Sequence, residues 1–175
     1  GRYGEPIFYH YALLKAVLKR YNPQIIILSL DAFNLAQDKD DYDLISVLLP
    51  YGDSHPELQE IINLKGPYER LKMISTIYPY NSLLLPMISG NLASSKEKNY
   101  TIKGYIPVQT TISGPLHIID YTKNTLLDTT KINSYTAFIK DCIKAKIKLF
   151  IVCPPFMINA IGMDNSIITA KKVAH

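Results

Sequence analysis

The chain lacks several features that would point to a particular chemistry. Its 175 residues contain no tryptophan and only two cysteines, Cys142 and Cys153. Neither cysteine has a second cysteine or a histidine at a metal-ligand spacing. Buried thiols therefore explain them better than a disulfide or a metal site. The sequence indicates no metal and no cofactor.

Phosphate loops and long apolar runs are also missing. No glycine-rich turn follows the apolar runs at 24–30 and 148–153, so nucleotide binding of the Rossmann or P-loop kind is unsupported. The nearest approach to a membrane span, residues 83–88, is interrupted by Pro86 and is far shorter than the roughly 18 residues required. The net charge of +4 comes from scattered basic residues, which we interpret as solvated helix faces and loop ends. We expect no transmembrane segment and no nucleic-acid partner.

What the sequence does contain is a helix that leads into a strand. Five apolar residues recur at helical spacing, and these are Ile7, Tyr11, Leu14, Leu18 and Tyr21. This stripe predicts an amphipathic helix that ends at Asn22-Pro23. The run QIIILSL at 24–30 is continuously apolar and β-branched, as in a parallel strand covered on both faces.

The same pattern returns near the other end of the chain. Ile132, Tyr135, Ile139 and Cys142 form a second helical stripe, and residues 148–153 form a second buried strand. Two such units in one 175-residue domain predict an α/β fold with an open parallel sheet and right-handed crossovers.

The segments between the two units differ in character. Residues 56–93 have helical spacing without a strand, which predicts a helical insertion. Residues 94–130 are polar and turn-rich, and this long loop excursion suits a lid or binding loop as well as it suits simple packing. The chain starts without methionine, and residues 170–175 resemble a helix cut in the middle. We expect a piece of a longer protein.

Three sets of residues in the sequence are possible sites. Gly52-Asp53-Ser54 has the GDS pattern of acyl-hydrolase nucleophiles, but it precedes Pro56-Glu57, so a helix cap is favoured over a nucleophile. The acidic residues Asp38, Asp40, Asp41 and Asp43 do not fit an EF-hand and indicate a solvated loop. The histidines His10, His55, His117 and His175 have no partner at an identifying spacing. His10 is best explained as a packing residue, and no Ser/His/Asp system can be assembled from order alone.

Polar residues follow the first strand at Asp31 and Asn34, where α/β enzymes keep their chemistry. From here the sequence resembles a known family. GRYGE at 1–5, the helix, and NPQIIIL at 22–28 are similar to the second and third conserved blocks of the SGNH/GDSL hydrolases, in particular their bacterial envelope-associated branch. Residues 78–85, 103–107 and 149–155 fit the same resemblance.

The resemblance implies a flavodoxin-like three-layer sandwich and ester hydrolysis through an acyl-serine, on acylated carbohydrate, envelope polymers or small esters in the cell envelope. Gly4 would supply an oxyanion-hole N–H, an interaction that can be worth about 3 kcal/mol. Asp31 stands where the family has an asparagine donor, and its carboxylate would repel an oxyanion. Asn34 could substitute for it.

The blocks that carry the family's Ser, Asp and His match nothing in the sequence. The nucleophile and base are therefore not identifiable, and we expect this chain alone to show no esterase turnover. A non-catalytic relative that serves as a binding or structural module is the alternative. An unrelated α/β domain with an interaction surface on its tyrosine-rich insertion is a third possibility. The oligomeric state is left open.

Overall fold

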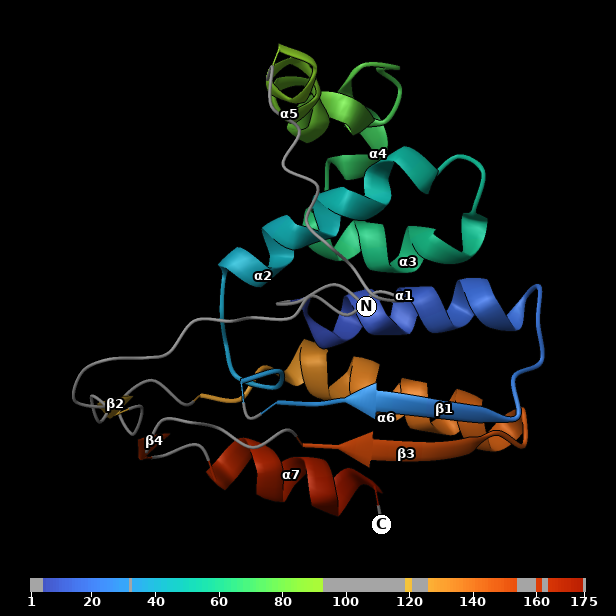
Figure 1. Cartoon of the computed structure of the whole chain (residues 1–175), viewed down its shortest axis with the longest axis vertical. Helices are drawn as coiled ribbons and strands as arrows, with labels where there is room; N and C mark the ends of the chain where they lie inside the picture. The colour runs from blue at the N-terminus through green and yellow to red at the C-terminus, as the bar shows by residue number, and fades with distance from the viewer. Residues whose placement is uncertain are drawn as a thin grey trace.

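Two helix-to-strand units form the centre of the structure, a computed structural model. It describes residues 5–31, 33–92, 119–120, 126–153, 160–161 and 164–174. Helix α1 (Ile7–Leu18) leads into β1 (Ile25–Ser29), and α6 (Thr129–Lys144) leads into β3 (Lys148–Val152). The two strands are parallel, and Figure 1 shows them side by side with α1 and α6 packed along them. Mixed α/β character is thus confirmed.

Local sequence explains where the second unit begins and turns. The carboxylate of Asp128 accepts hydrogen bonds from the backbone N–H groups of Thr130 at 2.8 Å and Lys131 at 3.3 Å, which caps α6. After α6, Lys146 adopts a left-handed conformation with φ of 57°. This single residue turns the chain from the helix into β3.

The core lies between α1, α6 and one face of the sheet. Ile7, Phe8 and Leu14 of α1 are buried together with Tyr135 and Phe138 of α6. The predicted stripe of α1 is right for its first three members and wrong at Tyr21, which is 71% exposed. The helix ends at Leu18, before Tyr21 can complete the stripe.

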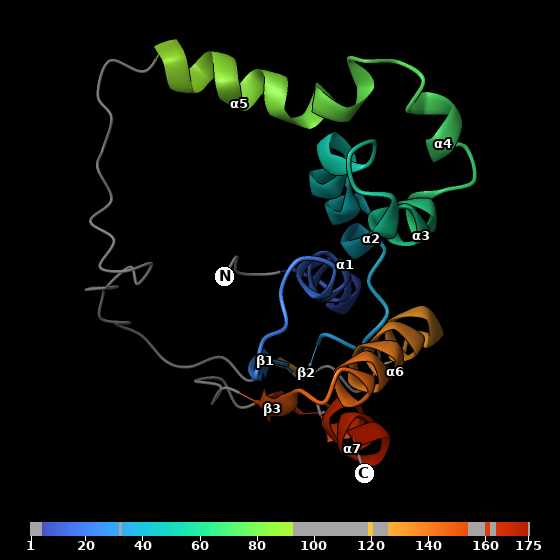
Figure 2. The same ribbon diagram turned by 90° about the vertical axis from the view of Figure 1, so that its right-hand side faces the viewer.

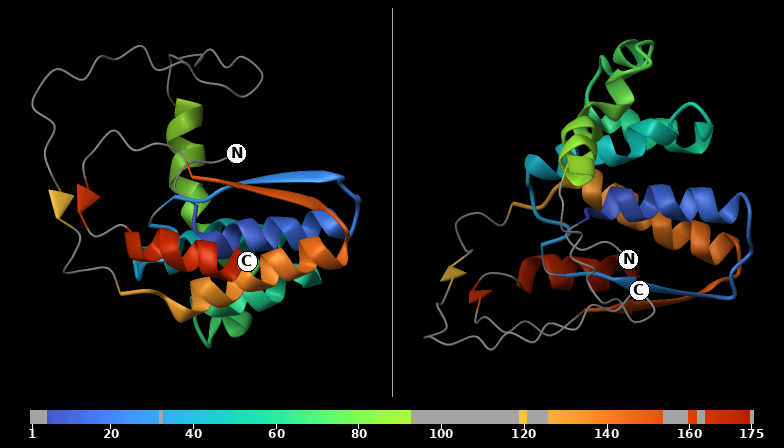
Figure 3. Two further views of the ribbon diagram at one scale, coloured as in Figure 1. Left: turned by 90° about the horizontal axis from the view of Figure 1, so that it is seen from below. Right: turned by 45° about the horizontal axis from the view of Figure 1, so that its top comes forward.

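Among the described residues both strands are covered on one face, so the predicted cover on both faces is not seen there. In β1, Leu28 is 4% exposed while Ile27 is 70% exposed, and in β3 Phe150 and Val152 are also exposed. Helices α1, α6 and α7 (Asp164–Ala174) all lie on the same side of the strands in Figures 2 and 3. Right-handed connections that progress in one direction place their helices on one face. The described part of the chain therefore does not show a third layer.

A group of short helices lies on the far side of α1 from the sheet (Figure 2). Its members are α2 (Asp40–Asp43), η1 (Leu44–Tyr51), η2 (Pro56–Leu58), α3 (Gln59–Ile62), η3 (Asn63–Lys65), α4 (Glu69–Lys72), η4 (Tyr78–Tyr80) and α5 (Asn81–Leu92). Between 56 and 92 the segment contains no strand, and before α5 its helices are pieces of about one turn. Gly66 lies between η3 and α4, and glycine interrupts helices.

Little of the predicted loop excursion at 94–130 lies inside the described residues. The part that does includes β2 (Ile119–Asp120), which pairs in parallel with β4 (Ala160–Ile161). Ala36 also forms an isolated antiparallel bridge with Leu127 just before α6. This bridge joins the segment that follows β1 to the start of the second helix-to-strand unit, α6 and β3.

Two predictions about charged residues need correction. The acidic loop is not simply solvated, because Asp41 pairs with Lys131 and Asp43 pairs with Lys65 at 3.1 Å. Lys131 is fully buried, so the basic residues are not all on solvated faces.

The two cysteines differ in burial. Cys142 is buried as predicted, whereas Cys153, which follows the end of β3, is exposed and so departs from the prediction of a buried thiol. Among the described helices, none combines the length and apolar character that a membrane crossing requires.

Candidate functional site

The carboxyl ends of β1 and β3 meet at one edge of the sheet. The strands are in register, with Ser29 opposite Val152. The backbone N–H of Leu30 donates to the carbonyl of Val152 at 2.9 Å, which extends the pairing by one residue. Asp31 and Cys153 then follow the two strands. Because the strands run in parallel, both polar residues reach the same end of the sheet.

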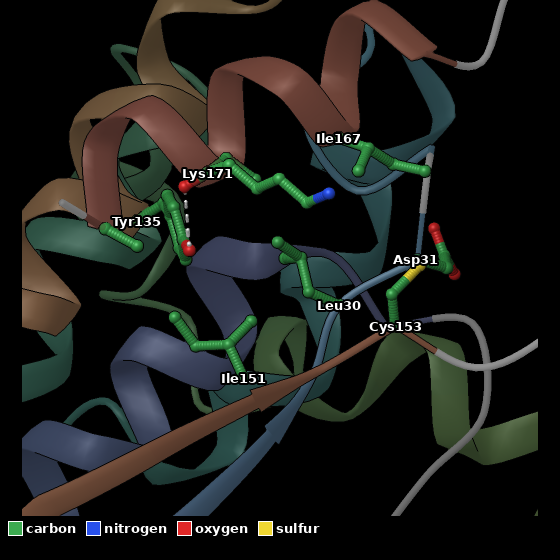
Figure 4. Close-up of a pocket in the computed structure, with 9 residues that line it drawn as sticks. Leu30, Asp31, Tyr135, Ile151, Cys153, Ile167 and Lys171 are labelled. Carbon is green, nitrogen blue, oxygen red and sulfur yellow. Dashed lines mark hydrogen bonds between the residues drawn. The ribbon is translucent and has the colours of Figure 1, made fainter.

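A cavity of about 220 Å³ opens beside these strand ends. Helix α7 covers it, and Figure 4 shows the residues that surround it. Its walls are mostly apolar, and its lining consists of Leu30, Asp31, Tyr135, Ile151, Cys153, Ile167, Ala170, Lys171 and Ala174. A small apolar group fits such a space, with polar atoms left at the rim.

Tyr135 fixes the helix that covers the cavity. It is fully buried on α6, and its hydroxyl donates to the backbone carbonyl of Ala170 on α7 at 3.3 Å. Burial raises the pKa of Tyr135, so the phenol stays protonated and remains a donor at neutral pH. The hydrogen bond links α6 to α7 across the cavity wall.

Besides Tyr135, three polar side chains belong to the cavity lining: Asp31, Cys153 and Lys171. Lys171 comes from α7, and Figure 4 shows its ammonium group directed toward the side on which Asp31 and Cys153 lie. No acidic residue within the described part of the chain forms an ion pair with Lys171. Its ammonium can therefore donate to a ligand oxygen at this place.

Asp31 and Asn34 form a tight turn at the end of β1. The backbone N–H of Asp31 donates to Oδ1 of Asn34 at 2.8 Å, and the N–H of Phe33 donates to Oδ1 of Asp31 at 2.8 Å. Both contacts use side-chain oxygens as acceptors, as in an Asx turn. The Nδ2 group of Asn34 remains the donor of this turn, whereas an ionised Asp31 can only accept hydrogen bonds.

His10 lies on α1 near the same end of β1. Burial lowers its pKa, although a hydrogen bond with the Glu5 backbone and the charge of Asp31 both act to raise it. The imidazole is consequently neutral at neutral pH. The partial burial of His10 agrees with the predicted packing role.

The GDS segment lies elsewhere. Ser54 donates to the backbone carbonyl of Tyr51 at 3.3 Å, and η2 begins after His55 without a side-chain cap. The capping prediction is therefore wrong. His55 contacts Arg20, just beyond the carboxyl-terminal end of α1, whereas the charge of Asp31 acts on His10 nearer its start. Ser54 does not line the cavity.

The structure brings together some of the predicted residues and adds others. Asp31 and Asn34 share one turn, while Gly4, His117 and His175 lie outside the described residues. Tyr135 and Lys171 were not predicted as site residues. The spacing of Ile167, Ala170, Lys171 and Ala174 on α7 marks one helix face and could have drawn attention to it.

The comparisons with known proteins give no further assignment. The chain matches no protein-family model, no curated protein and no solved structure. The site is therefore described by its residues: a small apolar cavity, with Lys171 and the Asp31–Asn34 turn beside it.

Proposed function

We propose that this chain is the central part of an SGNH-type esterase-like protein that handles acyl esters of carbohydrates or envelope polymers. The observation that carries the proposal is the Asp31–Asn34 turn at the carboxyl end of β1, beside the apolar cavity. The cavity would take the acyl group, and Nδ2 of Asn34 would donate to the ester carbonyl oxygen. Lys171 is a second donor for an oxygen of the ligand.

The proposal includes the finer fold. In a flavodoxin-like three-layer sandwich, helices cover both faces of the parallel sheet. The exposed Ile25, Ile27, Phe150 and Val152 have the composition of strand residues that such a second helical layer would bury. Their exposure supports this architecture for the complete protein.

A non-catalytic relative is the second candidate, and Asp31 favours it. An ionised carboxylate at the end of β1 accepts hydrogen bonds and opposes a developing oxyanion. A protein that only binds acylated polymers tolerates this charge, because no negative oxygen forms in the site. The two candidates share the acyl cavity and differ in turnover.

Binding and turnover together test the proposal. We expect the chain to bind an O-acetylated xylo-oligosaccharide more tightly than the same oligosaccharide after deacetylation, as measured by isothermal titration calorimetry. Asn34→Ala should weaken binding of the acetylated form by about tenfold, the equivalent of about 1.4 kcal/mol. Equal affinity for the two oligosaccharides would overturn acyl recognition.

Turnover is measured with 4-nitrophenyl acetate and by labelling with a fluorophosphonate probe. We expect neither hydrolysis nor labelling by this chain, because its Ser54 lies away from the cavity. Labelling that Ser54→Ala abolishes would contradict this expectation and restore the GDS serine as a nucleophile. Saturable hydrolysis that depends on Asn34 would contradict the inactivity of the isolated chain.

A further inference from the structure

β1 has a second edge that does not face β3. The carbonyl of Gln24 accepts from the N–H of Lys148 at 3.0 Å, and the N–H of Leu30 donates to Val152 at 2.9 Å. Alternate residues of a parallel strand bond to the same neighbour. The even-numbered residues therefore face β3, and the N–H and C=O groups of Ile25, Ile27 and Ser29 point the other way. Among the described residues outside β1 and β3, none forms a backbone hydrogen bond with Ile25, Ile27 or Ser29.

This edge also lacks the usual protection against pairing. Natural edge strands carry lysine, proline, a bulge or a covering element. The sequence of β1, IIILS, contains no charge and no proline. Ile25 and Ile27 are both more than half exposed. An unpaired, uncharged edge of five residues is a template for another strand.

An apolar groove of about 210 Å³ runs beside the edge, between α1 and β1. Its lining consists of His10, Leu13, Leu14, Val17, Ile26, Ile27, Leu28 and Phe138, and none of these is acidic, lysine or arginine. His10 is neutral at neutral pH, because burial lowers its pKa. An uncharged, apolar occupant matches this lining.

Exposed apolar side chains lie on the two elements that form the groove. Leu13 and Val17 of α1 and Ile25 and Ile27 of β1 are all exposed. An apolar strand that docks here would remove part of their surface from water.

We propose that the free edge of β1 and this groove form a docking surface for an extended, uncharged, β-branched peptide strand, which adds to the sheet beside β1. An added strand satisfies the outward N–H and C=O groups, whereas a docked helix leaves them unpaired. The strand's side chains on one face fill the groove, and those on the other face lie beside Ile25 and Ile27. This inference does not depend on the esterase-like function.

A second copy of the chain fits this surface less well than a bare strand. In each copy, Leu28 of β1 is buried and Ile26 is half-buried on the side that faces α1. These side chains are already covered by their own helix, so they cannot enter the groove of a neighbour. A strand without its own covering helix has both faces available.

Amide hydrogen exchange measured by NMR tests the proposal on the 175-residue chain. The probe is a capped, uncharged heptapeptide of alternating valine and isoleucine with one threonine at each end. We expect saturating peptide to slow exchange at the amides of Ile25, Ile27 and Ser29 at least tenfold. The amides of Ile26 and Leu28, which already belong to the β1–β3 ladder, should change little.

A matched probe separates strand addition from general apolar binding. The same heptapeptide, N-methylated at every residue, has no N–H group to donate to β1 from either edge and should give no protection. Equal protection by the two peptides, or none by either, would overturn the proposal. Protection that is present without peptide and grows with protein concentration would identify a second copy as the occupant, which also overturns it.

Paired variants locate the surface. Ile27→Lys should weaken peptide binding at least tenfold, because it places a charge at the centre of the edge. Ile74→Lys is the control, since Ile74 is similarly exposed at 76% and lies after α4 in the helical group. Retained protection of the Leu28 amide shows that the Ile27 variant is folded. Equal weakening by both substitutions would contradict a site at β1.

Discussion

The buried ammonium group of Lys131 pairs with the carboxylate of Asp41, and it also donates to the backbone carbonyl of Ala36 at 2.5 Å. Lys131 lies in the first turn of α6, and Asp41 lies on α2. Beside them, the hydroxyl of Tyr42 donates to Oδ2 of Asp128, the residue that caps α6, at 2.8 Å. These contacts fasten the helical group to the unit that contains the sheet.

We predict that Asp41→Asn destabilises the chain more than Lys131→Met. The first substitution leaves a fully buried ammonium without its counter-charge and should cost about 3 kcal/mol or more. The second leaves a carboxylate that is 20% exposed and can reach water. The free energy of unfolding in urea measures both.

Asp43→Asn is the matched control on the same helix. Its carboxylate is 81% exposed and pairs with Lys65, so the loss should stay below about 1 kcal/mol. The double variant Asp41→Asn, Lys131→Met should cost less than the two single changes added together, since it removes both charges. Strict additivity would contradict the coupling of Lys131 with Asp41.

One-sided burial of β1 predicts opposite outcomes for two neighbouring residues. Leu28→Ala removes a side chain packed in the core and should cost about 2–5 kcal/mol. Ile27→Ala changes a side chain that is 70% exposed and should cost less than about 0.5 kcal/mol. Urea unfolding compares the two, and similar losses would indicate that both faces of β1 are covered.

Glu57 predicts a pH dependence of stability in acid. A hydrogen bond to its own backbone N–H, together with Lys19 and Arg20, lowers the pKa of Glu57 to about 2 against the opposing effect of burial. The unfolded chain therefore binds the proton more readily, and stability falls as the pH falls from about 4.5 toward 2. We expect Glu57→Gln to remove this part of the dependence.

The measurement is the free energy of unfolding at several pH values between 5 and 3, in both proteins. The folded state of the original chain has the lower pKa, so the stabilisation is fully present above pH 4.5. The original chain should lose stability more steeply than the variant as acid is added. Parallel curves for the two proteins would contradict the contribution of Glu57.

Lys171 and Lys172 form a matched pair for ligand binding. Lys171 lines the cavity, whereas its neighbour Lys172 does not. If the proposed acyl site is correct, Lys171→Ala removes a charged hydrogen bond and should weaken binding of the acetylated oligosaccharide about tenfold. Lys172→Ala should leave the affinity unchanged, as measured by calorimetry. An equal effect of both would indicate a general electrostatic attraction.

Local sequence was sufficient to predict the two helix-to-strand units. Stripes such as Ile7, Tyr11 and Leu14 repeat at the helical period, and β-branched runs such as 25–28 favour strands, so pattern alone locates these elements. The same pattern could not predict which faces of the strands are buried. An uninterrupted apolar run is equally compatible with one or two covering layers, because burial depends on elements distant in sequence.

The candidate site was predicted in part for the same reason. Asp31 and Asn34 follow a strand in the sequence, and a polar strand end in an α/β fold is a local signal. Tyr135 and Lys171 join them because α6 and α7 pack beside the strand ends. Spacing along α7 marks a helix face but does not say what that face packs against. The wrong capping prediction at Ser54 has a similar origin, because a serine shortly before a proline is compatible with several kinds of turn.

The sequence by itself determined the helical and strand periodicity, the mild positive charge and the polar end of β1. Only the tertiary structure decided that Lys131 is buried beside Asp41 and that α1, α6 and α7 share one face of the sheet. It also decided that one edge of β1 has no strand partner among the described residues. Periodicity is a property of neighbouring residues along the chain. Burial, charge pairing and strand order depend on which distant segments meet in space.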